Sequence, residues 1–171
     1  MRKASDVRPV ATSLYFLPVE TRMPMKFGPE TLTHVTCARV RLLVANPQGE
    51  TAVGWGETPL SVQWVWPSSL TYEERLGVLK EFCVTLAEAW ATFDTMGHPI
   101  EVGHDFQQEV LPRLLASTNE RRGAEREPMP WLAALVCCSA FDIALHDAYG
   151  VLHGRPIYEL YGPGLMQHDL S

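Results

Sequence analysis

The chain has 171 residues, of which 46% are hydrophobic and 20% charged, a composition typical of one globular domain and not of a disordered or fibrous chain. Fourteen Lys and Arg residues against twenty Asp and Glu give a net charge of −6, which argues against a sequence-independent grip on nucleic acid phosphates. A complete eightfold β/α barrel, which takes roughly 200 residues or more, is not expected in this length.

The N-terminal residues and the cysteines indicate a cytoplasmic protein. No signal peptide follows Met1, and no run of 18 apolar residues free of charge occurs, so no membrane segment is expected. The four cysteines fit neither a Cys-x-x-Cys metal site nor a disulfide scaffold. We expect them to be buried free thiols: Cys37, Cys83, Cys137 and Cys138.

Residues 11–57 have the pattern of antiparallel strands, with many β-branched and aromatic side chains. Apolar and polar residues alternate most clearly in residues 32–44, and Asn46-Pro47-Gln48-Gly49 predicts a type I turn before a return strand at 51–57. Residues 11–20 are the expected first strand. The prolines and glycine of residues 21–29 predict an irregular loop after it.

The second half of the chain has helical periodicity. Thr71 and Glu74 have the spacing of a capping box, which predicts a long amphipathic helix that ends before Gly97. Asp105 is expected to cap a shorter helix, with Pro112 near its start or at a kink.

The last helices follow a charged stretch. Residues 117–128 are polar and predict an exposed connection. Pro130 suits the start of a further long helix, which runs toward Gly154, and Pro156 suits the start of a short final turn of helix.

These elements predict an α+β fold, a three-stranded antiparallel meander followed by a bundle of three to four helices. Residues 1–9 are expected to form a tail and residues 10–164 the domain. Within the domain the meander is expected at 10–57 and the helices at 71–161, and residues 165–171 are expected to form a second tail.

Two groups of polar residues are candidates for sites. Asp142, His146 and Asp147 combine carboxylates and imidazole at helical spacing, which suits a metal site, although one His flanked by Asp is more typical of an ion-pairing or surface group. His104 and Asp105 combine a base with an acid, but neighbours in sequence rarely face each other productively.

Gly54-Trp55-Gly56-Glu57 places two glycines at alternate positions of a strand. One face of that strand then carries no side chains, which permits another backbone or a ligand to approach closely. A bulged edge of the sheet explains the same pattern.

The chain resembles the N-terminal capping domain of the enolase superfamily, in its mandelate racemase and muconate-lactonizing branch. Three segments in the same order carry the resemblance: Gly-Trp-Gly-Glu-Thr-Pro at 54–59, Ala-Phe-Asp-Ile-Ala-Leu-His-Asp at 140–147 and Gly-Arg-Pro-Ile-Tyr-Glu-Leu-Tyr-Gly at 154–162. The resemblance covers about residues 10–164, although residues 97–128 are longer than the usual connection of the family. It implies a domain that covers the mouth of a (β/α)₇β barrel.

The resemblance also implies that two loops of the cap close over the substrate. By position these are residues 21–27 and 57–66. Some of their side chains are expected to meet a substrate carboxylate and others to exclude water from the reacting carbon, unless they merely pack on the sheet. The cations are Arg22 and Lys26, and the apolar side chains are Met25, Phe27, Trp64 and Trp66.

The implied parent enzyme is an isomerase or lyase in which a base removes the proton α to a carboxylate and Mg²⁺ stabilises the enediolate. In the family the lysines, the acidic metal ligands and the second base come from the barrel, which would follow Ser171. The cap alone is therefore expected to be noncatalytic, with no metal or cofactor of its own, and Glu57 and Asp147 are not expected to be ligands. Its expected partners are the barrel, from the same gene or a separate chain, a small carboxylate substrate, and further copies in a homo-oligomer.

Two other functions stay open. One is a free-standing α+β binding or interaction module without enzyme activity. The other is a small independent enzyme that uses His104 or His146. The DNA after the Ser171 codon distinguishes the cap from the module, because a barrel would add a Lys-x-Lys strand and spaced Asp and Glu residues.

Overall fold

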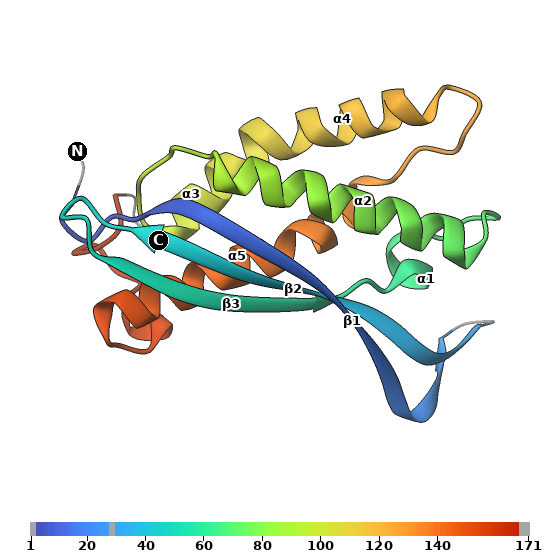
Figure 1. The fold of residues 1–171 in the computed structure, drawn as a ribbon, viewed down its shortest axis with the longest axis horizontal. Coiled ribbons are helices and arrows are strands. Elements are labelled where there is room, and N and C mark those ends of the chain that lie inside the picture. Colours follow the sequence, from blue (N-terminus) through green and yellow to red (C-terminus); the bar gives the residue numbers. More distant parts are fainter. Residues whose placement is uncertain (1–2, 28–29, 168–171) are drawn as a thin grey trace.

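The sheet is a three-stranded antiparallel meander in the order β1-β2-β3, as seen in a computed structural model that describes residues 3–27 and 30–167 (Figure 1). Its strands are β1 (Arg8–Phe27), β2 (Glu30–Ala45) and β3 (Thr51–Pro59). The helices that follow are α1 (Val62–Val65), α2 (Tyr72–Ala91), α3 (Pro99–Asp105), the π-helical turn η1 (Phe106–Val110), α4 (Leu111–Arg122), α5 (Trp131–His153) and the 3-10 turn η2 (Ile157–Glu159). The predicted α+β class is confirmed.

The alternating pattern of β2 separates a buried face from a wet one. Val40 and Leu42 are fully buried toward the helices, while Arg39 on the other face pairs with Glu57 of β3 at 2.6 Å. The predicted turn between β2 and β3 is present, because the Gly49 amide donates to the Asn46 carbonyl at 3.0 Å.

Strands β1 and β2 continue past the end of β3 as a two-stranded arm, residues 20–27 and 30–35 (Figure 1). The expectation of an irregular loop at 21–29 is therefore wrong for residues 21–27. Residues 25–27 pair with residues 30–32 in antiparallel fashion, with Met25 opposite Leu32, and residues 21–24 form the irregularity before this pairing. A register shift between Glu20 and Met25 accommodates Pro24, which has no N–H to donate. The remaining residues of that loop, 28 and 29, lie outside the described chain.

Helix α5 packs on β3 backbone against backbone. A Cβ atom at Gly56 would overlap the Ala140 carbonyl oxygen and lie 2.6 Å from the Ala144 nitrogen, and one at Gly54 would overlap the backbone of Ala144 and Ala148. The side-chain-free face of Gly54 and Gly56 thus receives the alanine face of α5, not a ligand. This contact places the helix across the sheet at a distance that no larger residue allows.

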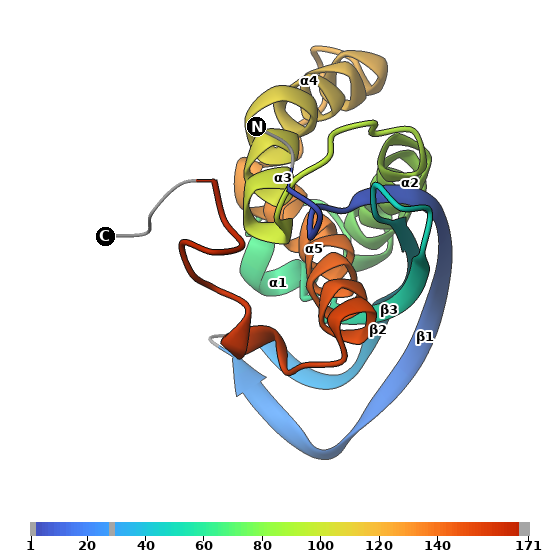
Figure 2. The same cartoon turned by 90° about the vertical axis from the view of Figure 1, so that its left-hand side faces the viewer.

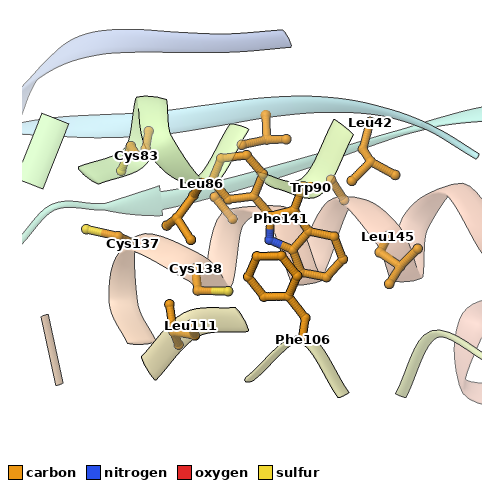
Figure 3. Packing of buried hydrophobic residues seen from close by; sticks show 14 of the residues in the cluster. Leu42, Cys83, Leu86, Trp90, Phe106, Leu111, Cys137, Cys138, Phe141 and Leu145 are labelled. Atoms are coloured by element: carbon orange, nitrogen blue, oxygen red, sulfur yellow. The ribbon is translucent and has the colours of Figure 1, made fainter. Parts of the chain in front are cut away.

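An aromatic cluster joins α2, η1 and α5 in the centre of the core (Figure 3). Trp90 of α2 is fully buried and stacks on Phe106 with the ring centroids 4.1 Å apart, and the parallel ring of Phe141 lies 6.4 Å away. Phe93 meets Phe106 edge to face. These rings hold the long helical segment after residue 98 against the two helices that line the sheet.

The segment between α2 and α5 differs from the prediction. Residues 99–122 form one continuous helical run, in which the π-helical turn η1 precedes Pro112. Asp105 lies inside this run and is not a cap. The cap is His98, whose Nδ1 accepts from the Ile100 amide at 3.3 Å and whose own amide donates to Glu101. The exposed connection is accordingly shorter than residues 117–128 and begins after Arg122.

Two further expectations concern Thr71 and the cysteines. The Thr71 hydroxyl accepts from the Glu74 amide at 3.2 Å, so the predicted cap of α2 is confirmed. All four cysteines are buried and free, and burial raises the pKa of Cys138 to about 12. These thiols belong to the packing of the core.

Helix α5 is long and apolar enough to cross a membrane by length and composition alone, with a mean hydropathy of 1.4 over its most apolar window. Half of that window is buried within the domain, and its alanine face contacts β3. In Figure 2, α2 and the sheet lie on one side of it. This is the position of a core helix.

Candidate functional site

The arm presents the first group of predicted site residues to solvent. Arg22, Met25 and Lys26 are all exposed, and Met25 is 59% exposed. Within the chain that the structure describes, neither cation forms an ion pair. The backbone of Phe27 ends β1, but its side chain lies outside what the structure describes.

The second predicted segment, residues 57–66, is named here the α1 segment. It begins in β3, whose pairing with β2 is prolonged by a bond from the Leu60 amide to the Thr36 carbonyl at 2.8 Å. Leu60, Val62 and Val65 are buried, so the single turn of α1 is fixed on the core. Its Trp64 side chain turns outward and is 51% exposed.

The arm and the α1 segment lie at the same end of the molecule (Figure 1). The base of the arm also contacts the start of α2. The rings of His34 and Tyr72 meet edge to face there, with their centroids 6.2 Å apart. The structure therefore brings the two segments that the sequence selected to one end of the sheet.

Trp66 is placed differently from the other predicted residues. It is only 1% exposed, and its indole N–H donates to the Glu127 carboxylate at 2.9 Å. The guanidinium of Arg122 lies 5.1 Å from the centroid of its ring. Trp66 thus packs within the chain, and Trp64 is the tryptophan of this segment that faces solvent.

Sequence reasoning misses two features of this end of the molecule. Met23, 71% exposed on the arm, lies in the segment expected to be an irregular loop, where no side-chain register could single it out. Glu127 stands in a charged stretch typical of a solvated connection, although its partners are Trp66 and Ser68. No local signal points to it, since these partners lie 61 and 59 positions away.

A polar cluster on α5 joins this helix to the C-terminal segment. The Tyr161 hydroxyl lies 2.7 Å from His146 Nδ1, and His146 Nε2 lies 3.9 Å from the Asp142 carboxylate. Burial raises the pKa of Asp142 to about 6 and lowers the pKa of His146. Both groups are thus held toward their neutral forms.

We expect Asp142→Asn to stabilise the domain at pH 7.5 by about 1 kcal/mol, a figure reduced because the carboxyl is one third exposed. Folding raises the pKa of Asp142 from its ordinary value of 3.8 to about 6. The protonated carboxyl therefore contributes fully to the stability of the fold below pH 3.8, and this contribution is lost as the pH rises through about 6. Asparagine removes that loss. Urea unfolding at pH 5 and 7.5 measures the difference, with Asp94→Asn at an exposed position as the control. If Asp142→Asn is less stable than the wild type at pH 7.5, the expected stabilisation is contradicted.

The other polar groups have structural partners. Asp147 accepts from the Trp55 amide at 2.8 Å and so covers the free edge of β3, and Glu57 pairs with Arg39. His104 is exposed and Asp105 half-buried, and His104 Nδ1 lies 3.5 Å from the carboxylate of this sequence neighbour. Across residues 3–27 and 30–167, no three His, Cys, Asp or Glu side chains are grouped so as to hold a metal ion.

Solved structures of two enzymes share this fold. Over 89% of its length the chain matches a dipeptide epimerase from Cytophaga hutchinsonii solved with Mg and D-Ala-L-Val, with 18% identity and a TM-score of 0.50. Over 91% it matches a dipeptide epimerase from Enterococcus faecalis solved with Mg and L-Leu-L-Tyr, with 15% identity and a TM-score of 0.51. No model of a known protein family and no curated protein matches the chain.

The chain spans about a third of these enzymes, 32% and 34% of their lengths. At these identities the likeness concerns the fold. The chain therefore shares its α+β fold, a three-stranded meander followed by helices, with the matched third of these two epimerases.

Proposed function

We propose that this chain is the capping domain of an enolase-superfamily enzyme and shapes the surroundings of a small carboxylate substrate without performing the chemistry itself. The proposed reaction of the parent enzyme is removal of the proton α to that carboxylate, as in racemases, cycloisomerases and acid-sugar dehydratases. One observation carries the proposal: the arm and the α1 segment lie at one end of the sheet, and both expose large side chains there.

Arg22 and Lys26 supply positive charge in the proposed site. Both are exposed on the arm, at the end of the molecule from which Trp64 also projects. A guanidinium offers a carboxylate two parallel hydrogen bonds, whereas an ammonium acts as a point charge. We therefore assign the orientation of the substrate to Arg22 and a general attraction to Lys26.

Apolar side chains at the same end of the molecule would exclude water. Met25 and Trp64 are half exposed or more in the isolated domain, and Phe27 follows Met25 on the same strand. Closing them over a substrate lowers the local dielectric constant and strengthens each charge interaction inside. Trp66, which is buried, supports this surface from beneath.

A barrel partner would cover the apolar side chains that α5 leaves exposed. Leu132, Ile143 and Val151 are 40%, 47% and 58% exposed and share one side of the helix by their spacing. Trp131 at the start of α5 and Tyr158 in η2 are exposed as well. Apolar side chains in this number are typical of a surface that another protein or domain covers.

Within residues 3–27 and 30–167 there is no group of three His, Cys, Asp or Glu side chains that could hold Mg²⁺. In the proposed enzyme the metal ion and the acid/base lysines belong to the barrel. The two epimerases of the same fold were solved with Mg, in agreement with such a division.

We expect Arg22→Ala to lower kcat/KM of the complete enzyme by about tenfold to a hundredfold, the loss of a charge-assisted hydrogen bond to the substrate. The effect should lie mainly in KM. Arg113→Ala removes an exposed arginine of α4 and serves as the control. Steady-state kinetics in which Arg22→Ala behaves like Arg113→Ala would remove the arm from the site.

A further inference from the structure

Trp66, at the end of the α1 segment, is bonded to a distant part of the chain. Its indole N–H donates to one carboxylate oxygen of Glu127 at 2.9 Å, and the hydroxyl of Ser68 donates to the other at 2.6 Å. Glu127 thus holds two residues that closely follow α1. It lies in the connection between α4 and α5, residues 123–130.

Two arginines complete the surroundings of Trp66. The buried Arg75 donates from Nη1 to the Trp66 carbonyl at 2.5 Å and from Nε to the Thr71 carbonyl at 3.3 Å. Arg122 lies over the indole ring and donates to the Glu127 carbonyl at 3.2 Å. Hydrogen bonds from Ser68 and Trp66, with the charges of both arginines, lower the pKa of Glu127, so the carboxylate stays ionised.

The connection that carries Glu127 is itself fixed. The side-chain amide of Asn119 on α4 donates to the Met129 carbonyl at 3.1 Å and accepts from the Met129 amide at 2.8 Å. Met129 is buried in the core. A two-way bond of this kind holds the connection at a fixed distance from the helix, so Glu127 is presented on a rigid support.

Helix α1, by contrast, has little stability of its own. It is a single turn of four residues, and Ser61 at its N-terminus makes no side-chain capping bond. A helix this short depends on tertiary contacts. Its position is set on one side by the buried Val62 and Val65 and at its end by Trp66.

We infer that Glu127 is a positioning residue, which through Trp66 and Ser68 fixes the orientation in which the α1 segment presents Trp64. This inference rests on the proposed function for the role of Trp64, but the positioning itself is a property of the chain. The α4–α5 connection thereby sets the shape of the substrate-facing surface from outside that surface. Trp66 then acts through Trp64 and not by touching the substrate.

Hydrogen exchange of the full chain tests this inference. Glu127→Ala should speed amide exchange in residues 61–66 about tenfold or more, since the bonds to Trp66 and to the nearby Ser68 are lost, and should shift the indole N–H resonance of Trp64. Glu127→Gln should restore most of the protection, because its amide oxygen accepts from Trp66 and its amide nitrogen donates to Ser68. Glu125→Ala changes an exposed acid of the same connection and is the matched control.

Unchanged exchange in residues 61–66 of Glu127→Ala overturns the inference, as does faster exchange spread evenly over the domain. Should Glu127→Ala not fold, Ser68→Ala removes one of the two bonds and must raise exchange in the same residues. None of these readouts involves a substrate or a barrel. If they behave as expected while Arg22→Ala has no kinetic effect, the proposed function fails and the positioning role stands.

Discussion

Gly56→Ala should destabilise the domain by about 3 kcal/mol, a large part of the roughly 5–15 kcal/mol that stabilises a folded domain. The new methyl group would overlap the Ala140 carbonyl oxygen of α5, and the neighbouring Ala144 nitrogen lies 2.6 Å from the same point. Backbone atoms cannot turn aside as a flexible side chain can. Helix α5 must therefore move away from β3, which opens the backbone-to-backbone contact between them. Urea unfolding monitored by circular dichroism measures the loss.

Gly77→Ala is the control, and it should raise the free energy of unfolding where Gly56→Ala lowers it. Gly77 lies inside α2, and no atom lies within 4 Å of the position of an added Cβ. Alanine there should stabilise the helix by about 0.5–1 kcal/mol, because glycine loses more backbone entropy on folding. Equal stability of Gly56→Ala and the wild type would show that α5 does not pack backbone to backbone on β3.

Trp90→Ala should cost about 3–5 kcal/mol, the range for removing a large aromatic side chain from a core. Trp90 is fully buried and is stacked on Phe106, close to Phe141 (Figure 3). The Phe93 ring meets Trp90 edge to face, with the ring centroids 6.0 Å apart. The loss of Trp90 leaves a cavity between α2, η1 and α5 that no single neighbour can fill. Thermal unfolding should show a clearly lower Tm for this variant.

Trp64→Ala, at the half-exposed tryptophan of α1, is the matched control. It removes the same side chain from a surface position and should change the free energy of unfolding by about 0.5 kcal/mol or less. A similar loss in both variants would contradict the assignment of Trp90 to the core and Trp64 to the surface. A stable Trp64→Ala variant is also suited to kinetic work on the complete enzyme.

Local patterns predict the elements whose partners lie nearby in sequence. The turn at Asn46-Pro47-Gln48-Gly49 and the Thr71 cap depend on neighbours three or four positions apart, and both are present. The Gly54 and Gly56 pair indicates a close approach on one face of β3. It does not say whether a ligand or a backbone approaches, because the alanines that do so lie some 90 positions further along the chain.

The wrong predictions all concern residues whose conformation is decided by distant partners. Pro24 suggests an irregular loop, yet pairing with β2 on both sides of it extends the strand. Asp105 suggests the start of a shorter helix, with Pro112 near that start or at a kink, yet the π-helical turn before Pro112 lies within one longer helical run. The burial of Trp66 also depends on a distant partner. Nothing near Trp66 in the sequence indicates that its indole N–H will donate to Glu127.

The sequence of the DNA that follows the Ser171 codon tests the central proposal most directly, namely that this chain caps a barrel enzyme. The proposal predicts a series of β/α units in the same frame or in a neighbouring gene, with a Lys-x-Lys strand and spaced Asp and Glu residues that bind Mg²⁺. A purified complex of the two parts should then act on a small carboxylate. If no barrel-coding series is found in frame or beside the gene, the proposal is contradicted and a free-standing binding module is favoured.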